Sequence, residues 1–139
     1  MKFTIESAGG VASRLVLDGH ELLFDQPVAV GGADLGPSPL DVMLASIGAC
    51  AHYFAAAFLR ARKLPVEGLA VDVEGEKATE GPRRLKRVTI NVRLPPGVPE
   101  EMRPRIEQAV RGCPVVGTLV SPPEVMLTLT TAGPLVPPT

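Results

Sequence analysis

The segment SPLDVMLASIGACAHYFAAAFLRARKLP, from Ser38 to Pro65, decides how this chain folds. Its first residues carry three signals for the start of a helix. Ser38 can cap the helix, Pro39 suits the first helical position, and Asp41 completes a capping box at the positive end of the helix dipole. Because the residue before a proline disfavours helical backbone, we expect this helix to end near Lys63.

The expected helix is apolar on every side. Between Val42 and Leu59, only Ser46 and His52 interrupt the apolar run. The run is just long enough for a membrane span, but its six alanines, its glycine and the absence of an aromatic belt favour a core helix. A helix that is apolar all round is expected to be buried all round, wrapped by sheets and covered in part by a second subunit.

Short strands are expected before this helix. Lys2–Ser7 alternates apolar and polar residues, and Ala12–Leu17 and Glu21–Phe24 follow it. The dipeptide Asp18-Gly19 lies between the last two stretches. It is typical of a type I′ hairpin turn, because both central positions of that turn need a positive φ. We therefore expect three strands, the last two forming a hairpin.

The second half of the chain reads as two strands, two shorter helices and one more strand. In order, these elements are Val66–Glu74, Leu85–Leu94, Pro99–Arg111, Pro114–Val120 and Val125–Thr131. Pro104 is expected to kink the first of the two helices or to delay its start. Strands grouped together and helices grouped together predict an α+β fold with antiparallel sheets, in the order βββ-α-ββ-αα-β. The length predicts a single domain over residues 1–139, with a loose tail from Gly133 to Thr139.

Charge and composition exclude several classes of function. The net charge is −1, and the chain has no Trp, one Tyr and four Phe, so neither a basic field nor stacking rings point to nucleic acid. Two cysteines are too few for a disulfide scaffold in a chain of 139 residues. The N-terminus lacks the charged start and apolar run of a signal peptide, so we expect a cytoplasmic protein with reduced thiols.

The two cysteines have contrasting surroundings. Cys113 stands just before Pro114, where a helix N-terminus stabilises a thiolate. Cys50 lies within the apolar helix, where burial disfavours the thiolate unless a cation is near. The side chains one and two turns from Cys50 predict an apolar pocket with two hydroxyls at its margin. They are Met43, Ser46, Ile47, Tyr53 and Phe54.

Simpler interpretations exist for the same residues. A free cysteine in an alanine-rich helix is usually a small core residue, and a cysteine before a helix is often only a cap. His20 and His52 could join the cysteines in a zinc site, but no pair of these residues has the spacing of zinc ligands, so we expect no metal. His52 lies about 200° around the helix from Cys50 and cannot reach it within one chain.

Two segments resemble the motifs of the OsmC/Ohr family, named after osmotically inducible protein C and the organic hydroperoxide resistance protein. The stretch GPSPLDVMLASIGAC, from Gly36 to Cys50, is similar to the first-cysteine motif of that family. The stretch CPVVGTL, from Cys113 to Leu119, is similar to its second-cysteine motif. The glycine pair Gly31-Gly32 before the helix and the expected order of elements fit the same family.

The resemblance implies a cytoplasmic homodimer in which two chains intertwine and their long helices cross inside a wrapping of sheets. It also implies thiol peroxidase chemistry without a metal or other cofactor. Cys50 would attack an organic hydroperoxide and become a sulfenic acid, and Cys113 would condense with it to a disulfide. A dithiol reductant, lipoyl-type or other, would then reopen that disulfide. The predicted apolar pocket would hold the substrate.

The chain departs from the peroxidase pattern at the charged positions. Peroxidase members pair an arginine with a glutamate that directly follows the helix-starting proline. Here Leu40 takes the glutamate position, with Asp41 next, and Val11 takes the arginine position. Arg14 is the one arginine before the helix, which makes it the candidate to stabilise the thiolate, with Asp41 as its partner.

Two further functions stay open beside the peroxidase. One is a dimer of the same fold without peroxidase activity, which binds a small apolar ligand at the subunit interface. The other is a structural dimer in which both thiols are buried and inert. Neither nucleic acid nor a membrane is an expected partner.

Overall fold

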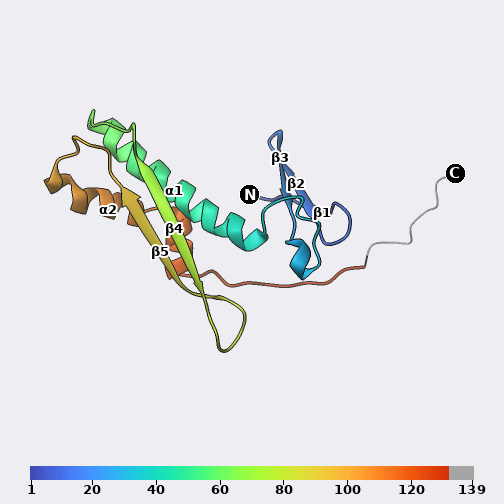
Figure 1. Cartoon of the computed structure of the whole chain (residues 1–139). Helices are drawn as coiled ribbons and strands as arrows, with labels where there is room; N and C mark the ends of the chain where they lie inside the picture. Colours follow the sequence, from blue (N-terminus) through green and yellow to red (C-terminus); the bar gives the residue numbers. More distant parts are fainter. Residues whose placement is uncertain (132–139) are drawn as a thin grey trace.

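The computed structural model describes residues 1–131, and the tail predicted to be loose, Gly133–Thr139, lies outside this range. Within it, the chain is a mixed α+β protein with three α-helices and two antiparallel sheets (Figure 1). The elements are β1 (Ile5–Ser7), β2 (Ser13–Leu17), β3 (His20–Phe24), α1 (Pro39–Ala61), β4 (Ala70–Lys77), β5 (Leu85–Arg93), α2 (Arg103–Arg111) and α3 (Pro114–Val120). The predicted fold class and the order βββ-α-ββ-αα are therefore confirmed.

The N-terminal sheet has the strand order β1-β2-β3, and its second hairpin is the predicted one. Leu17 pairs with His20 across the turn. Asp18 and Gly19 adopt φ values of 51° and 81°. Two successive positive φ values are what a type I′ turn requires, so the sequence signal is confirmed by the backbone.

A buried carboxylate organises the loop that leads from β3 to α1. The Asp25 side chain is 2% exposed. It accepts backbone N–H hydrogen bonds from Gln26 at 2.8 Å, Ala33 at 3.0 Å and Leu35 at 3.1 Å. These bonds, that of Leu35 foremost, lower the pKa of Asp25, although burial opposes them. The Asp25 N–H also donates to the Pro37 carbonyl, so one residue ties both ends of the loop together.

Glycines allow this loop to close against the backbone. A Cβ on Gly32 would lie 1.7 Å from the Gln26 carbonyl oxygen, and a Cβ on Gly36 would lie 2.4 Å from the Leu23 carbonyl oxygen. No side chain could shift to relieve such contacts. The glycines therefore have a structural role in the path of the loop.

The start of α1 follows the predicted capping pattern. The Asp41 N–H donates to Ser38 Oγ at 3.2 Å, and the Ser38 hydroxyl donates to the Asp41 carboxylate at 2.6 Å. Pro39 occupies the first turn. The helix ends at Ala61, and Lys63 then adopts a φ of 56°, which turns the chain away.

Within one chain α1 is buried on one side only, so its predicted burial on every side depends on the expected second subunit. Its buried face consists of Ile47, Gly48, Ala51, Ala55 and Leu59. On the other side, Tyr53 is 64% exposed and Met43 is 38% exposed. By length and composition α1 is also the one helix among residues 1–131 that could cross a membrane, a test that core helices pass as well.

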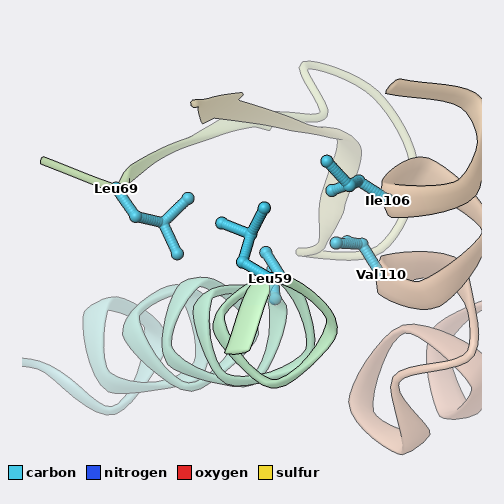
Figure 2. Packing of buried hydrophobic residues seen from close by; sticks show 6 residues of the cluster. Leu59, Leu69, Ile106 and Val110 are labelled. Carbon is cyan, nitrogen blue, oxygen red and sulfur yellow. The ribbon is translucent and has the colours of Figure 1, made fainter. Parts of the chain in front are cut away.

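The core lies where α1 and α2 pack against the β4–β5 hairpin. Leu59 from α1, Leu69 before β4, and Ile106 and Val110 from α2 converge there (Figure 2). The helix approaches the sheet closely at Gly48, where a Cβ would lie 2.8 Å from a Val73 methyl group. A small residue at this position therefore sets the distance between helix and sheet.

The first strand of this hairpin begins later than predicted. β4 starts at Ala70, whereas residues 66–69 form a turn closed by the Leu69 N–H and the Val66 carbonyl. Gly68 adopts a φ of 89° within it. The apolar alternation continues through this turn because Val66 and Leu69 both face the core, so periodicity alone did not mark the boundary.

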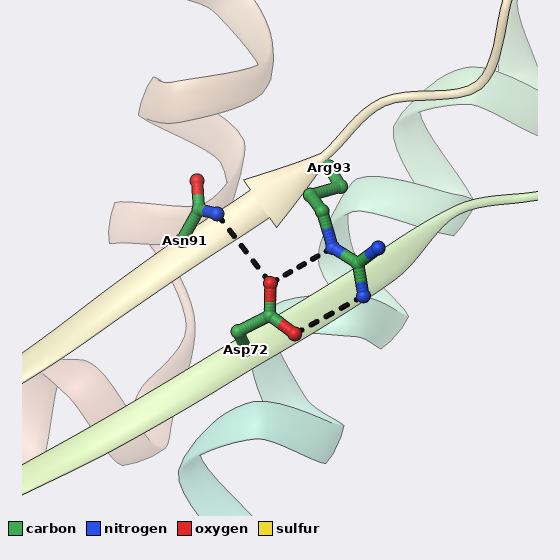
Figure 3. A network of polar contacts seen from close by, with 3 residues as sticks. All are labelled: Asp72, Asn91 and Arg93. Atoms are coloured by element: carbon green, nitrogen blue, oxygen red, sulfur yellow. Dashed lines mark hydrogen bonds and ion pairs between the residues drawn. The ribbon is translucent and has the colours of Figure 1, made fainter.

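The outer face of the hairpin is polar. Arg93 donates two hydrogen bonds to Asp72, at 2.8 Å from Nε and 3.1 Å from Nη2, and Asn91 donates a third at 3.4 Å (Figure 3). All three side chains are exposed, so the network contributes about 0–1 kcal/mol. One face of this sheet therefore meets solvent while the other meets the helices.

The two short helices begin where the prolines predict. A 3-10 turn at Glu100–Met102 comes first, and Pro104 then occupies the first turn of α2, so that the proline delays the start of the helix. Cys113 is the N-cap of α3. Both expectations are confirmed.

The predicted final strand Val125–Thr131 is absent from the described residues. This segment has no regular structure, and Val125, Met126, Leu127 and Leu129 are 84% to 89% exposed. Figure 1 shows it running away from α3 as an extended trace. An alternating pattern produces a strand only where a sheet edge accepts its backbone hydrogen bonds, and none does so here.

Candidate redox site

A disulfide joins Cys50 to Cys113 across 63 residues of sequence. Cys50 lies in the middle of α1, and Cys113 precedes the first turn of α3. Their Cα atoms are 6.3 Å apart, which is within the usual range for a disulfide. The fold therefore brings together the two residues that the sequence singled out.

The two sulfur-bearing residues differ in burial. Cys113 is fully buried, whereas Cys50 is half-buried beside the exposed side of α1. The Cys113 N–H donates to the Val110 carbonyl at 3.0 Å, which fixes its backbone to the end of α2. Its side chain makes no capping hydrogen bond to α3, because its sulfur is bonded to Cys50.

The predicted pocket residues do not share one environment. Ile47 is fully buried in the core, whereas Tyr53 is largely exposed, with its ring edge-on to Phe54 at 5.3 Å. The Ser46 hydroxyl donates to the Met43 carbonyl at 2.7 Å, so it is directed along its own helix. One chain thus supplies only part of a pocket around Cys50.

The structure gives Arg14 and Asp41 other partners than each other. Arg14 lies on β2 and forms an exposed ion pair with Glu6, its neighbour across the sheet, at 3.7 Å. The Asp41 carboxylate accepts the Ser38 hydroxyl. Figure 1 places the N-terminal sheet beyond the N-terminal end of α1, away from the middle of that helix. Within one chain, Arg14 therefore belongs to the sheet and not to the disulfide.

A groove that the sequence did not indicate lies between β5, α2 and α3. It has a volume of about 560 Å³, and its apolar walls are formed by Val88, Ile90, Val92, Leu94, Ile106, Val110 and Val116. Arg103, Glu107 and Arg111 also line it. The groove contains none of the predicted site residues. The sequence feature that corresponds to this groove is the apolar alternation of β5, and the same alternation is equally consistent with core packing.

The described residues hold no cluster of three or more His, Cys, Asp and Glu side chains that could bind a metal ion. Among the predicted site residues, Cys50 and Cys113 are the pair that the fold brings into bonding contact. Two thiols that can reach bonding distance can store and release two electrons.

Comparison with known proteins places this arrangement in a family. Residues 31–128 match the family model described as OsmC-like protein. Similar solved structures include an OsmC-like protein from Mycoplasma pneumoniae, 20% identical, with a TM-score of 0.73 over 87% of each chain. A Psychrobacter arcticus protein, provisionally named as an osmotic stress induced and detoxification response protein, is 19% identical, with a TM-score of 0.75 over 85% of this chain and 87% of that one.

A third similar structure is an organic hydroperoxide resistance protein from Elizabethkingia anophelis, 22% identical, with a TM-score of 0.59 over 85% of this chain and 88% of that one. Identities this low establish a common fold and nothing finer. No curated protein sequence matches the chain. The family match covers most of the chain and spans both cysteines, and on that ground the chain belongs to the OsmC-like protein family.

Proposed function

We propose that this protein is a thiol peroxidase that reduces organic hydroperoxides in defence against oxidative stress. The observation that carries the proposal is the Cys50–Cys113 disulfide, which links two helices through residues far apart in the sequence. Relatives of the same fold are named organic hydroperoxide resistance proteins, and that name supports the substrate class for this chain.

The reaction divides into three balanced steps. The Cys50 thiolate attacks the hydroperoxide, the O–O bond breaks, and the products are an alcohol and the Cys50 sulfenic acid. The Cys113 thiol then displaces water from that sulfenic acid and forms the disulfide. A dithiol finally reduces the disulfide and is itself oxidised, so that one hydroperoxide and one dithiol yield an alcohol, water and an oxidised dithiol.

The difference in burial supports Cys50 as the attacking cysteine. Cys113 is fully buried, so a hydroperoxide cannot reach it before its surroundings open. Cys50 is half-buried and lies next to the exposed side of α1, where Tyr53 and Met43 reach solvent. Cys50 is therefore the attacking residue and Cys113 the resolving one.

We further propose that the active form is a cytoplasmic homodimer. The exposed apolar side of α1 leaves Cys50 with an incomplete pocket, and a second copy packed on that side would complete it. Met43 and Phe54 would then form apolar walls that favour an organic hydroperoxide, whereas Ile47 is fully buried within its own chain. Arg14 would serve the thiolate only after leaving Glu6, and that exposed pair costs about 0–1 kcal/mol to break.

The placement of Arg14 and Asp41 favours one alternative. Within one chain Arg14 is paired with Glu6 on the sheet, so it is not placed to stabilise a thiolate at Cys50, and such a thiol reacts slowly. In that case the same dimer would bind a small apolar ligand at the subunit interface and would not turn over peroxide.

The test compares three proteins in an assay of organic hydroperoxide consumption with a dithiol reductant. We expect wild-type turnover and its loss in Cys50→Ser. The matched variant Cys113→Ser keeps the attacking thiol, so it should consume one equivalent of hydroperoxide and hold a sulfenic acid that a 1,3-dione traps. Equal turnover in Cys50→Ser and wild type would overturn the proposal.

A mass measurement under non-reducing conditions separates the two functions. After one equivalent of hydroperoxide, the reduced wild-type protein should lose two hydrogens as Cys50 and Cys113 join. A mass that stays at the reduced value contradicts the peroxidase and favours the ligand-binding dimer.

A further inference from the structure

We propose that the dithiol reductant attacks the disulfide at the sulfur of Cys50 and releases Cys113. The mixed disulfide that forms during reduction then lies on Cys50 and not on Cys113. One sulfur atom would thus meet both the hydroperoxide and the reductant. The proposal rests on the proposed function, whose reductive step it assigns.

Access separates the two sulfur atoms of the disulfide. A thiolate attacks a disulfide sulfur from the side opposite the leaving sulfur, so the attacked atom needs an open approach. Cys113 is fully buried and offers none. Cys50 is half-buried, and Ser46 and Tyr53, one turn before it and one turn after it on α1, are exposed. The approach to Cys50 is therefore from the exposed side of α1.

The burial of Cys113 is produced by its own chain. Its N–H donates to the Val110 carbonyl at the end of α2, and α3 packs against both α1 and α2. Val115 and Val116 are half-buried at the start of α3. A second copy of the chain could only add cover to a residue that has no exposed surface, so Cys113 stays closed to a reductant in the proposed homodimer as well.

The same homodimer needs a passage to Cys50 for a different reason. In the proposed function the hydroperoxide has to reach the Cys50 sulfur, whatever part of α1 the second subunit covers. A dithiol that attacks Cys50 uses this passage, whereas attack on Cys113 would need a second opening through the packed side of α3.

The groove between β5, α2 and α3 does not supply such an opening. Val110 and Val116, which lie on either side of Cys113 in the sequence, line this groove, whereas Cys113 does not. The groove therefore does not open onto the Cys113 sulfur.

The reductive step is balanced in atoms and electrons. One thiolate of the dithiol bonds to the Cys50 sulfur while the S–S bond breaks, and the electron pair of that bond leaves with Cys113, which takes up a proton. The second thiolate of the dithiol then attacks the dithiol sulfur of the mixed disulfide and releases Cys50, which is protonated in turn. The dithiol loses two electrons and becomes a disulfide, and the two cysteines gain them.

The place of the released Cys113 thiol explains why the reductant is a dithiol. Cys113 remains beside Cys50 within the folded chain, so it can attack the mixed disulfide again and expel the reductant. A monothiol is returned to solution in this way. A dithiol carries its own second thiol next to the mixed disulfide, and that thiol competes with the return of Cys113.

Trapping of the mixed disulfide tests the proposal on the oxidised wild-type protein. The protein is treated briefly with the small monothiol cysteamine and then unfolded in acidic denaturant with excess N-ethylmaleimide, which alkylates the released thiol. Trypsin separates the cysteines, because no Lys or Arg lies within residues 15–60, which contain Cys50, or within residues 112–139, which contain Cys113. We expect cysteamine on the first peptide and N-ethylmaleimide on the second, in about tenfold excess or more over the reverse pair.

The control is the same treatment of protein that is already unfolded in denaturant. Both sulfur atoms are then accessible, and the two patterns should approach equal amounts. Cysteamine mainly on the Cys113 peptide of the native protein, or the same ratio in native and unfolded protein, would overturn the proposal.

The outcome does not depend on turnover, because no hydroperoxide is used. Cysteamine on Cys50 in a protein that consumes no hydroperoxide would contradict the proposed function and leave this assignment standing. Cysteamine on Cys113 in a protein that does consume hydroperoxide would contradict this assignment alone.

Discussion

The Asp25 carboxylate accepts more backbone hydrogen bonds than any other described side chain before α1. Its carboxylate accepts three backbone N–H groups, and its own N–H reaches Pro37, the residue before the helix cap. The sequence does not indicate this role, because the number of residues between an acidic side chain and the N–H groups that donate to it is not fixed. Its partners are set by the loop path that Gly32 and Gly36 permit.

Asp25→Asn is expected to lower stability at neutral pH, since an amide accepts these N–H bonds less strongly than a carboxylate. Because the pKa of Asp25 is lowered in the folded protein, the direction in which this stability depends on pH can be predicted. The carboxylate contributes stability above its unfolded value of about 3.9, and this contribution is lost as the pH falls through the folded value below that. Denaturant unfolding should therefore show a gap between wild type and Asn that is constant above about pH 5 and narrows below about pH 4.

The control for Asp25 is Asp34→Asn in the same loop. Asp34 is exposed and has a positive φ that asparagine tolerates. A gap of the same size for both variants, at every pH, would show that overall charge and not the buried carboxylate is responsible.

Secondary-structure elements in this chain lie where the sequence predicts them when the predictive pattern spans only a few consecutive residues. The Asp18-Gly19 turn, the Ser38 cap of α1 and the Cys113 cap of α3 each depend on two to four neighbouring residues, and each is where the sequence predicts it. Capping at Ser38 gives a direct measure of such a signal.

Ser38→Ala is expected to cost about 1 kcal/mol of unfolding free energy, because it removes the acceptor for the Asp41 N–H at the start of α1. Equilibrium unfolding in denaturant measures this, with Ser7→Ala on the exposed β1 as the comparison. A loss below about 0.3 kcal/mol would show that the rest of the fold holds the helix start without the cap.

Predictions that depend on contacts with distant parts of the chain were less accurate than those that depend on neighbouring residues. The alternation of residues 125–131 predicts a strand, yet a strand also needs to pair with a sheet edge, and within the described chain this segment pairs with none. The apolar circumference of α1 predicts burial, but one chain covers only the side that faces β4, β5 and α2. The site shows the same division: the motifs found Cys50 and Cys113, whereas Arg14 and Asp41 took partners that spacing could not reveal.

At the scale of the whole molecule, the described chain exposes an unusual amount of apolar surface for a protein that stands alone. Tyr53 on α1 and the segment from Val125 to Leu129 are the clearest examples. Contiguous exposed apolar surface commonly marks a protein interface. The homodimer proposed above would cover the α1 side of it.

Tyr53→Arg is expected to disrupt that homodimer, because it places a charge in the middle of the exposed side of α1. Sedimentation equilibrium should give twice the chain mass for wild type and a shift of at least about tenfold in dissociation constant for the variant, a change of about 1.4 kcal/mol. Thr79→Arg, in the exposed turn between β4 and β5, is the matched control. A wild-type protein that sediments at the mass of one chain would contradict the prediction. So would a Tyr53→Arg variant that dimerises as tightly as the wild type and the Thr79→Arg control, because α1 would then not be the interface.

The 63-residue separation of the two cysteines has a consequence for the unfolded chain. Once the bond closes, nearly half of the polypeptide becomes a ring that contains every residue of the main core cluster. A ring of this size removes enough freedom from the denatured ensemble to favour the native state by about 4 kcal/mol in the chain-entropy description. Oxidation of the two thiols would thereby raise the free energy of unfolding, so that the oxidised protein resists denaturation better than the reduced one.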